Sequence, residues 1–165
     1  MKRIQYILFA ICILSIWSCK PEEFAPIGEP QNVVKSIQGN WGLTKVTQID
    51  QDASTKGFPY KQLDITSVYP YTDLALAFLG DAQGNPTTFT ITSGNAPKIA
   101  DLTSGNWKVD DLKAPTTISL INGAVTNSLS IGSYVSLKAG KLIIKRDKKL
   151  NGKVILSYQY EFTKK

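Results

Sequence analysis

The chain has 165 residues, of which 42% are apolar and 19% charged, and its formal net charge is +6. This is the composition of a globular protein with room for one domain, and it argues against a disordered chain. Once Lys2 and Arg3 are removed with the leader predicted below, 17 basic residues face 13 acidic ones, an excess too weak to favour nucleic-acid binding.

Residues 1–18 have the features of a cleaved secretory leader. Lys2 and Arg3 give a positive start, and residues 4–17 are almost wholly apolar. Fourteen helical residues would span about 21 Å, which is short of the roughly 30 Å hydrocarbon core of a bilayer. The segment is therefore predicted to be a signal peptide and not a membrane-spanning helix.

The end of this leader resembles the lipobox of bacterial lipoproteins. Small Ser18 precedes Cys19, and Ile16 lies three positions before the cysteine, although Trp17 departs from the usual small residue. The resemblance implies that the Cys19 thiol is diacylated and that Cys19 becomes the new N-terminus. An ordinary signal peptide with an incidental cysteine is the alternative. Since Cys12 would leave with the leader, no thiol would remain for a disulfide or for a nucleophile.

Residues 19–32 are predicted to be a flexible tether, because three prolines in this stretch disfavour a regular helix. The charged run Lys20-Pro21-Glu22-Glu23 resembles the short acidic export signal of surface-exposed lipoproteins in Bacteroidetes. The resemblance implies a protein anchored by lipid in the outer membrane and exposed at the cell surface. A plain charged linker is the alternative.

Residues 33–165 are predicted to form one domain built almost entirely of strands. Asn151-Gly152 is a strong signal for a two-residue hairpin turn, because both positions tolerate positive φ. The other expected elements, in chain order, are a helical turn at 33–37, a strand at 41–49, a polar loop at 51–60, a hairpin of 74–79 with 87–92, and strands at 106–110, 116–121, 128–137 and 142–146.

The last strand shows the clearest periodicity. Apolar and aromatic side chains alternate with polar ones, which is typical of a half-buried antiparallel strand. About eight such strands at short spacing predict an all-β fold, an antiparallel up-and-down β-barrel, with a sandwich as the alternative. The residues expected on the buried face are Val154, Leu156, Tyr158, Tyr160 and Phe162.

Gly39-Asn40-Trp41 opens the first predicted strand directly after the helical turn. This arrangement resembles the lipocalin entrance, and it implies that Trp41 closes the barrel floor and that Gly39 lets the backbone pass close by. Gly105-Asn106-Trp107 is a second motif of this kind. With the lipobox and a basic C-terminal hairpin, the chain resembles the lipocalin-like lipoproteins of Bacteroidetes, small families mostly of unknown function. The resemblance covers roughly residues 37–165.

Arg146 is the only arginine after the predicted leader. In many lipocalins an arginine packs over the floor tryptophan, and the resemblance offers this role for Arg146. A solvent-facing arginine in a basic hairpin is the interpretation we favour. The lysines of this hairpin, residues 141–153, would protect edge strands from pairing between molecules, or would lie against anionic head groups.

The sequence offers little for catalysis, since it contains no histidine and no thiol outside the leader and lipobox. Asp110 and Asp111 are adjacent and would point to opposite faces of a strand. Asp50 and Asp52 have a spacing that could hold a calcium ion, but a polar loop is the expected role. We therefore expect no enzyme, no cofactor and no metal site.

Two binding surfaces are expected. An eight-stranded barrel interior has room for one small apolar ligand, and Phe58, Tyr60, Tyr69 and Tyr71 lie beside prolines in turns, where aromatic rings suit stacking on sugars. Capping of the barrel mouth by core aromatics is the alternative for these four. The predicted function is non-enzymatic binding of a small apolar or glycan ligand at the envelope. The alternative is a structural or interaction subunit that docks on another envelope protein.

Overall fold

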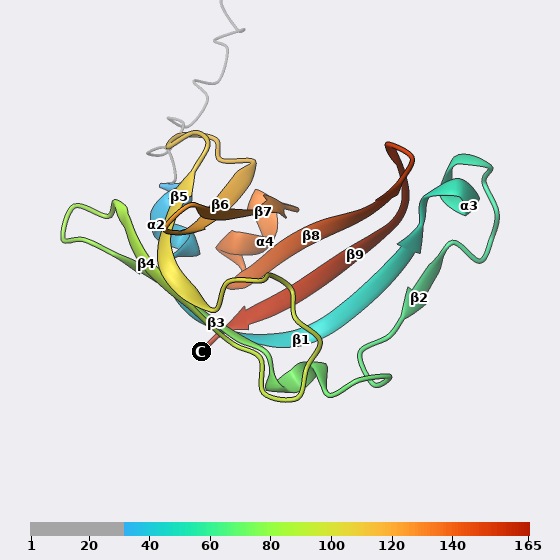
Figure 1. Cartoon of the computed structure of the whole chain (residues 1–165), viewed down its shortest axis with the longest axis horizontal. Coiled ribbons are helices and arrows are strands. Elements are labelled where there is room, and N and C mark those ends of the chain that lie inside the picture. The colour runs from blue at the N-terminus through green and yellow to red at the C-terminus, as the bar shows by residue number, and fades with distance from the viewer. Residues whose placement is uncertain (1–31) are drawn as a thin grey trace, which may run out of the picture. The chain divides into compact units, whose positions relative to one another are not determined.

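The computed structural model describes residues 32–165 (Figure 1). The predicted signal peptide, Cys19 and all of the tether except Asn32 lie outside the described residues. The elements in chain order are α2 (Val33–Ile37), β1 (Gly39–Asp50), α3 (Gln51–Thr55), β2 (Gln62–Asp64), the 3-10 helix η1 (Tyr71–Asp73), β3 (Ala75–Gly80), β4 (Pro86–Thr92), β5 (Ser104–Val109), β6 (Thr117–Asn122), β7 (Val125–Ile131), α4 (Tyr134–Lys138), β8 (Lys141–Leu150) and β9 (Lys153–Lys164).

Eight strands, β1 and β3 to β9, form a closed antiparallel barrel. From β3 onward each strand pairs with the next along the chain, and the barrel closes because β1 pairs with both β3 and β9. The additional short strand β2 pairs with β1 along residues 47–49. The predicted all-β class and the up-and-down barrel of about eight strands are therefore confirmed.

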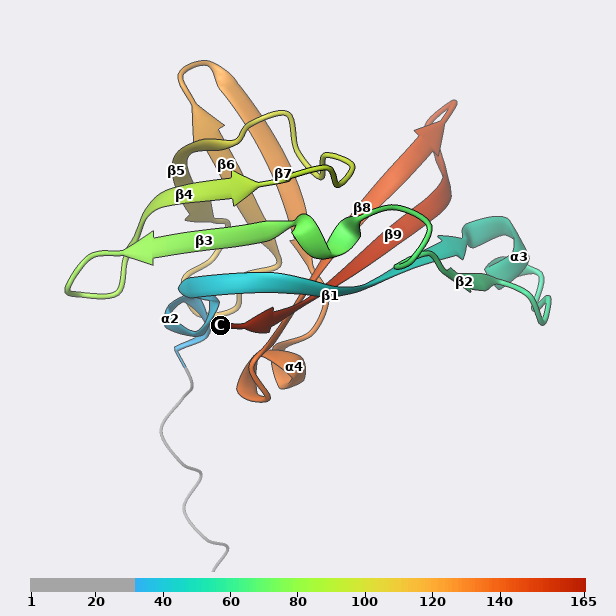
Figure 2. The ribbon, with the colours of Figure 1, turned by 90° about the horizontal axis from the view of Figure 1, so that it is seen from below.

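Three strands are longer than the others and shape one end of the molecule. β1, β8 and β9 reach past the rest of the barrel, where α3 and β2 lie beside them (Figures 1 and 2). Asn151 and Gly152 connect β8 to β9 with φ of 50° and 79°, the left-handed values that a two-residue hairpin turn requires. The extended strands create a concave sheet beyond the barrel.

Two predicted elements were wrong in part. Residues 51–55, expected in a loop, form α3, because the Asp50 carboxylate caps the helix by accepting a hydrogen bond from the Ala53 amide at 2.9 Å. The strand expected at 128–137 ends at Ile131, and α4 follows it. Of α4 only Leu137 is buried, so this segment lacks the alternating buried face of a strand.

Large side chains fill the barrel at the end where α2 and α4 contact each other. Trp41 is 0% exposed, and its indole Nε1 donates a hydrogen bond to the Ile37 carbonyl at the end of α2, at 2.8 Å. Trp107 is also buried, and its ring lies 5.1 Å from that of Phe78. Phe89 and Phe162 complete the aromatic part of this core. This end of the barrel is a packed interior.

The last strand has the predicted buried face along part of its length. Tyr160 and Phe162 are buried, and Tyr158 packs against the same core, whereas Val154 and Leu156 are half-buried and lie outside it. Ser157, on the opposite face, is buried as well, because Gln51 of α3 covers it and donates a hydrogen bond to its hydroxyl at 2.8 Å. The short helix α3 thus shields the outer face of β9 beyond the barrel.

Across residues 32–165, no helix combines the length and the apolar character that crossing a bilayer requires.

Candidate ligand-binding site

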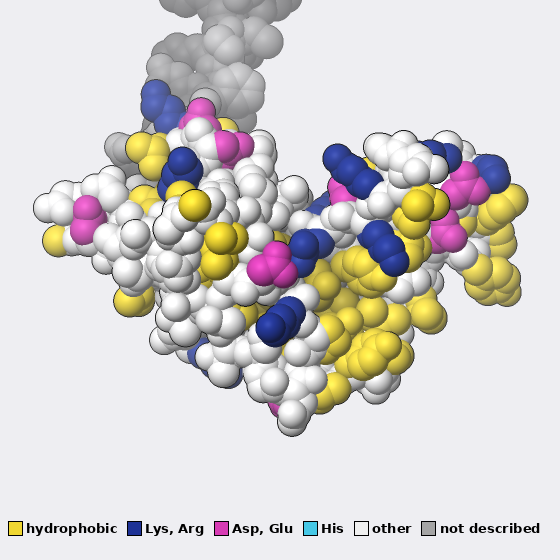
Figure 3. Space-filling model, viewed as in Figure 1, with side chains coloured by type: hydrophobic (Ala, Val, Ile, Leu, Met, Phe, Trp, Pro, Cys, Tyr) yellow, Lys and Arg dark blue, Asp and Glu magenta, His cyan; other side chains and the backbone are white. Residues whose placement is uncertain are grey.

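A cleft of about 670 Å³ lies at the open end of the barrel, where β1 and β9 extend beyond it. Its volume is within the range of small-molecule sites in proteins. Hydrophobic side chains gather along this hollow, over β9 and β1, in Figure 3. We call it the tyrosine cleft; its lining residues are Gln48, Leu63, Ile65, Val68, Tyr69, Tyr71, Pro97, Tyr158 and Tyr160.

The four tyrosines come from two separate parts of the chain. Tyr158 and Tyr160 lie two positions apart on β9, so both side chains point to the same face of the strand. Tyr71 begins η1 and is only 4% exposed. Its ring meets those of Tyr160 and Tyr69 edge-on, at centroid distances of 6.4 and 5.8 Å. Such edge-to-face contacts are favourable for aromatic pairs, and they fix the rings that line the cleft.

The tyrosine hydroxyl groups of this cleft have no hydrogen-bond partner among residues 32–165. Burial raises the pKa of Tyr160 to about 12, and burial also raises the pKa of Tyr71. In the described part of the chain, none of the four hydroxyls hydrogen-bonds to another protein group. No buried polar side-chain atom there lacks a partner, so these hydroxyls face solvent and can donate hydrogen bonds to a ligand.

The raised tyrosine pKa values predict a loss of stability in alkali. Tyr160 has a higher pKa in the folded than in the unfolded protein. Its contribution to the free energy of unfolding is therefore complete below about pH 10 and is lost as the pH rises towards 12. We expect the free energy of unfolding of residues 32–165, measured with urea, to fall over this interval. For Tyr160→Phe, the free energy of unfolding should fall less steeply over the same interval. A variant that loses stability as steeply as the wild type would contradict the assignment to Tyr160.

Two smaller cavities adjoin the tyrosine cleft and share lining residues with it. One, of about 280 Å³, is lined by Lys98, Arg146, Asp147, Lys148, Tyr158 and Tyr160. The other, of about 320 Å³, is lined by Gln48, Asp50, Tyr60, Lys61, Gln62 and Leu63. The open end of the barrel therefore combines an aromatic centre with a cationic side next to β8.

The structure separates the four aromatic residues proposed from sequence as a ligand platform. Tyr69 and Tyr71 lie together in the tyrosine cleft, with Tyr71 largely buried as a core aromatic at the barrel mouth. Tyr60 is 94% exposed and lies in the adjoining cavity. Phe58 is 54% exposed and lines none of these three cavities.

Sequence reasoning missed the part of the cleft contributed by β9. The period of two in the last strand predicts Tyr158 and Tyr160 in the barrel core. That assignment gave the correct face, but this part of β9 lies at the open end, where the same face lines the cleft. Two aromatic side chains in the middle of a long strand were the available signal.

Gly39 and Trp41, the motif residues at the closed end of the barrel, contact other parts of the domain and line no part of the tyrosine cleft. Gly39 has φ of 126°, and a Cβ atom there would lie 2.8 Å from the Lys164 side chain. The cation over the Trp41 ring is Lys164, with Nζ 5.5 Å from the ring centroid. Arg146 lies elsewhere and donates a hydrogen bond from Nη1 to the Ile99 carbonyl. Arg146 is exposed, as we expected from the sequence, and its hydrogen bond crosses the barrel mouth.

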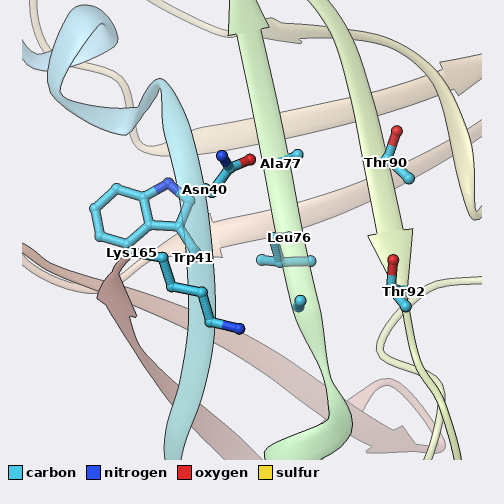
Figure 4. Close-up of a pocket in the computed structure, with 8 residues that line it drawn as sticks. Asn40, Trp41, Leu76, Ala77, Thr90, Thr92 and Lys165 are labelled. Atoms are coloured by element: carbon cyan, nitrogen blue, oxygen red, sulfur yellow. The ribbon is translucent and has the colours of Figure 1, made fainter.

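A further cavity, of about 310 Å³, lies on the outer wall of the barrel (Figure 4). Its floor consists of short side chains from β3 and β4, among them Ala75, Ala77, Thr90 and Thr92, which alternate with buried core residues. Lys165 is its one charged residue. The tyrosine cleft is the better candidate, because it offers aromatic faces and unpaired hydroxyls in a larger volume.

The carboxylates proposed as a calcium pair have other partners. Asp50 caps α3, and Asp52 pairs with Lys56 at 2.7 Å and with Lys153 at 3.4 Å. The hydrogen bond and charge of Lys56 lower the pKa of Asp52. Within residues 32–165, no three His, Cys, Asp or Glu side chains gather in a way that could hold a metal ion.

Fold and site together define a small all-β barrel domain with an open aromatic cleft. The chain belongs to the family described as Domain of unknown function (DUF5004), whose model matches residues 18–163. The description of that family assigns no activity or ligand. Searches among curated proteins and among solved structures returned no match.

Proposed function

We propose that the mature protein is a non-enzymatic binding protein, held by lipid in the outer membrane, which takes a small apolar or glycan ligand in the tyrosine cleft. The observation that carries this proposal is the cleft of about 670 Å³ itself, where Tyr69 and Tyr158 present ring surface and the buried Tyr71 and Tyr160 pack beneath it. Apolar walls with a few polar groups are typical of ligand sites.

The adjacent carboxylates Asp110 and Asp111 favour binding over catalysis. Hydrogen bonds from Thr116, followed by the Thr117 amide, lower the pKa of Asp110 to about 2, and the Ala114 and Lys113 amides lower the pKa of Asp111. Carboxylates held ionised in this way are poor proton donors at neutral pH. The sequence contains no histidine that could replace them.

The membrane part of the proposal depends on the N-terminal sequence. A lipobox-like segment ending at Cys19, followed by a proline-rich stretch, would hold the barrel at the envelope through acyl chains. The family match begins at residue 18, next to the predicted cleavage point, in keeping with a leader that lies outside the matched region.

Binding can be tested by calorimetry on the full chain in zwitterionic nanodiscs, with oligosaccharides or palmitate as titrants and empty discs as the blank. Tyr69→Ala should weaken binding by about 1 kcal/mol, roughly fivefold, because a stacked ring is lost. Phe58→Ala is the matched control, since Phe58 and Tyr69 are both 54% exposed but Phe58 lies outside the cleft. Affinity should not change between about pH 6 and 8, because the chain has no histidine.

Equal losses in both variants, or a strong pH dependence in this interval, would contradict binding in the tyrosine cleft. A protein that binds neither ligand class and co-purifies with an envelope protein would favour an interaction subunit instead. The exposed side chains Tyr60, Leu63 and Val68 at the edge of the cleft would then be its contact surface.

A further inference from the structure

Three cations lie beside the tyrosine cleft without a carboxylate partner. Lys98, Arg146 and Lys148 line the 280 Å³ cavity that shares Tyr158 and Tyr160 with the cleft. The three ion pairs found within residues 32–165 involve other lysines, at positions 45, 56 and 153. This end of the cleft therefore carries uncompensated positive charge.

The strand register brings this charge to the tyrosines. Arg146 of β8 pairs with Tyr158 of β9, and Lys148, two positions further on, lies on the same face of β8. Lys98 comes from the loop between β4 and β5. The neighbouring Ile99 carbonyl accepts a hydrogen bond from Arg146 Nη1, which holds the guanidinium at the mouth of the barrel.

One carboxylate, Asp147, also lines this cavity. Its side chain accepts a hydrogen bond from the Ser157 hydroxyl at 2.6 Å, and Ser157 is in turn bonded to Gln51 of α3. Asp147 is therefore held in a polar chain with residues on the outer face of β9. Three cations against one carboxylate leave the cavity positively charged.

We infer that the tyrosine cleft binds an acidic sugar, whose ring lies on the tyrosines and whose carboxylate or sulfate group is bound by Lys98, Arg146 and Lys148. This inference rests on the proposed function and selects one ligand class for the same site. Arginine and lysine form stronger hydrogen bonds to anionic oxygens than to neutral ones. A sugar ring offers hydroxyls that can pair with the tyrosine hydroxyls and with Gln48.

The same polar groups disfavour an acyl chain. A chain laid in the cleft would remove water from the hydroxyls of Tyr69 and Tyr158 without giving them a partner, which costs free energy. The cleft is also open to solvent along the face shown in Figure 3, whereas drug-sized apolar ligands are buried over most of their surface. A polar ring with an anionic substituent satisfies both the hydroxyls and the cations.

The test uses the full chain in zwitterionic nanodiscs and a pair of probes that differ only in whether their carboxyl groups are methylated. Tetragalacturonic acid carries carboxylates, and its full methyl ester is the same oligosaccharide without the charge. We expect the acid to bind at least about tenfold more tightly than the ester. Inorganic sulfate should compete with the acid, and added salt should weaken its binding.

Two double variants with the same change of net charge separate a site from a general surface effect. Lys98→Gln with Lys148→Gln should weaken binding of the acid by about tenfold and leave the ester unchanged. Lys108→Gln with Lys138→Gln, two exposed lysines away from the cleft, should leave both affinities within about twofold.

Several results would overturn the acidic-sugar assignment. Equal affinity for acid and ester, or equal losses in the two double variants, would remove the role of the cations and leave a neutral-glycan site, so the proposed function would stand. Palmitate binding that Tyr69→Ala weakens would assign the cleft to an apolar ligand. Absence of binding by acid, ester and palmitate would overturn both the inference and the proposed function.

Discussion

Replacing Trp41 with alanine should lower the free energy of unfolding of residues 32–165 by about 3–5 kcal/mol. The indole is completely buried in the hydrophobic core, and a large ring removed from such a site leaves a cavity that the closed barrel cannot fill. The variant also loses the hydrogen bond from Nε1 to the Ile37 carbonyl, which joins α2 to the first strand. Both losses act on the packed end of the barrel.

Urea unfolding followed by the fluorescence of Trp107 measures this change, since Trp107 remains in the variant. Trp41→Phe keeps most of the ring and loses the hydrogen bond, so its loss should be smaller. Leu112→Ala, at an exposed position, should change the free energy of unfolding by less than about 0.5 kcal/mol. A loss below about 1 kcal/mol for Trp41→Ala would contradict its role as the barrel floor and remove the basis of the lipocalin resemblance.

The barrel could be predicted because its signal is local. Alternation of apolar and polar side chains along residues 153–164 is a property of each strand by itself, and Asn151-Gly152 sets its turn through its own backbone. The helices α3 and α4 could not be predicted in this way. Each has five residues, too few for a helical period, and such short helices depend on capping and tertiary contacts.

The tyrosine cleft depends on relations that no single segment contains. Whether Tyr158 lies in the core or in a cleft is decided by its register opposite Gln48 of β1, because only the lengths of the paired strands determine where the barrel ends. The cationic side has the same origin. Lys98 and Arg146 are far apart in the sequence, and they meet because the loop after β4 crosses the mouth of the barrel to bond with β8.

Replacing the predicted lipid-bearing residue, Cys19, is expected to have a comparably large effect on membrane attachment. Cys19→Ser should abolish incorporation of labelled palmitate and release the protein from the membrane fraction, because the serine hydroxyl cannot form the thioether that carries the acyl chains. Bacterial lipoproteins carry two or three chains, and at about 0.8 kcal/mol per buried methylene, two chains suffice for stable attachment where one does not. The change should therefore be close to complete.

Cys12→Ser provides the matched control, since Cys12 is the other cysteine of the chain and lies within the predicted leader. Because the leader is removed, this variant should keep both the palmitate label and its place in the membrane fraction. The position of the label also tests the boundary between residues 18 and 19, since cleavage there would leave the acylated cysteine as the first residue in mass spectrometry. Label that persists in Cys19→Ser, or that is lost in Cys12→Ser, would mean that the chain is attached in another way and that the lipobox assignment is wrong.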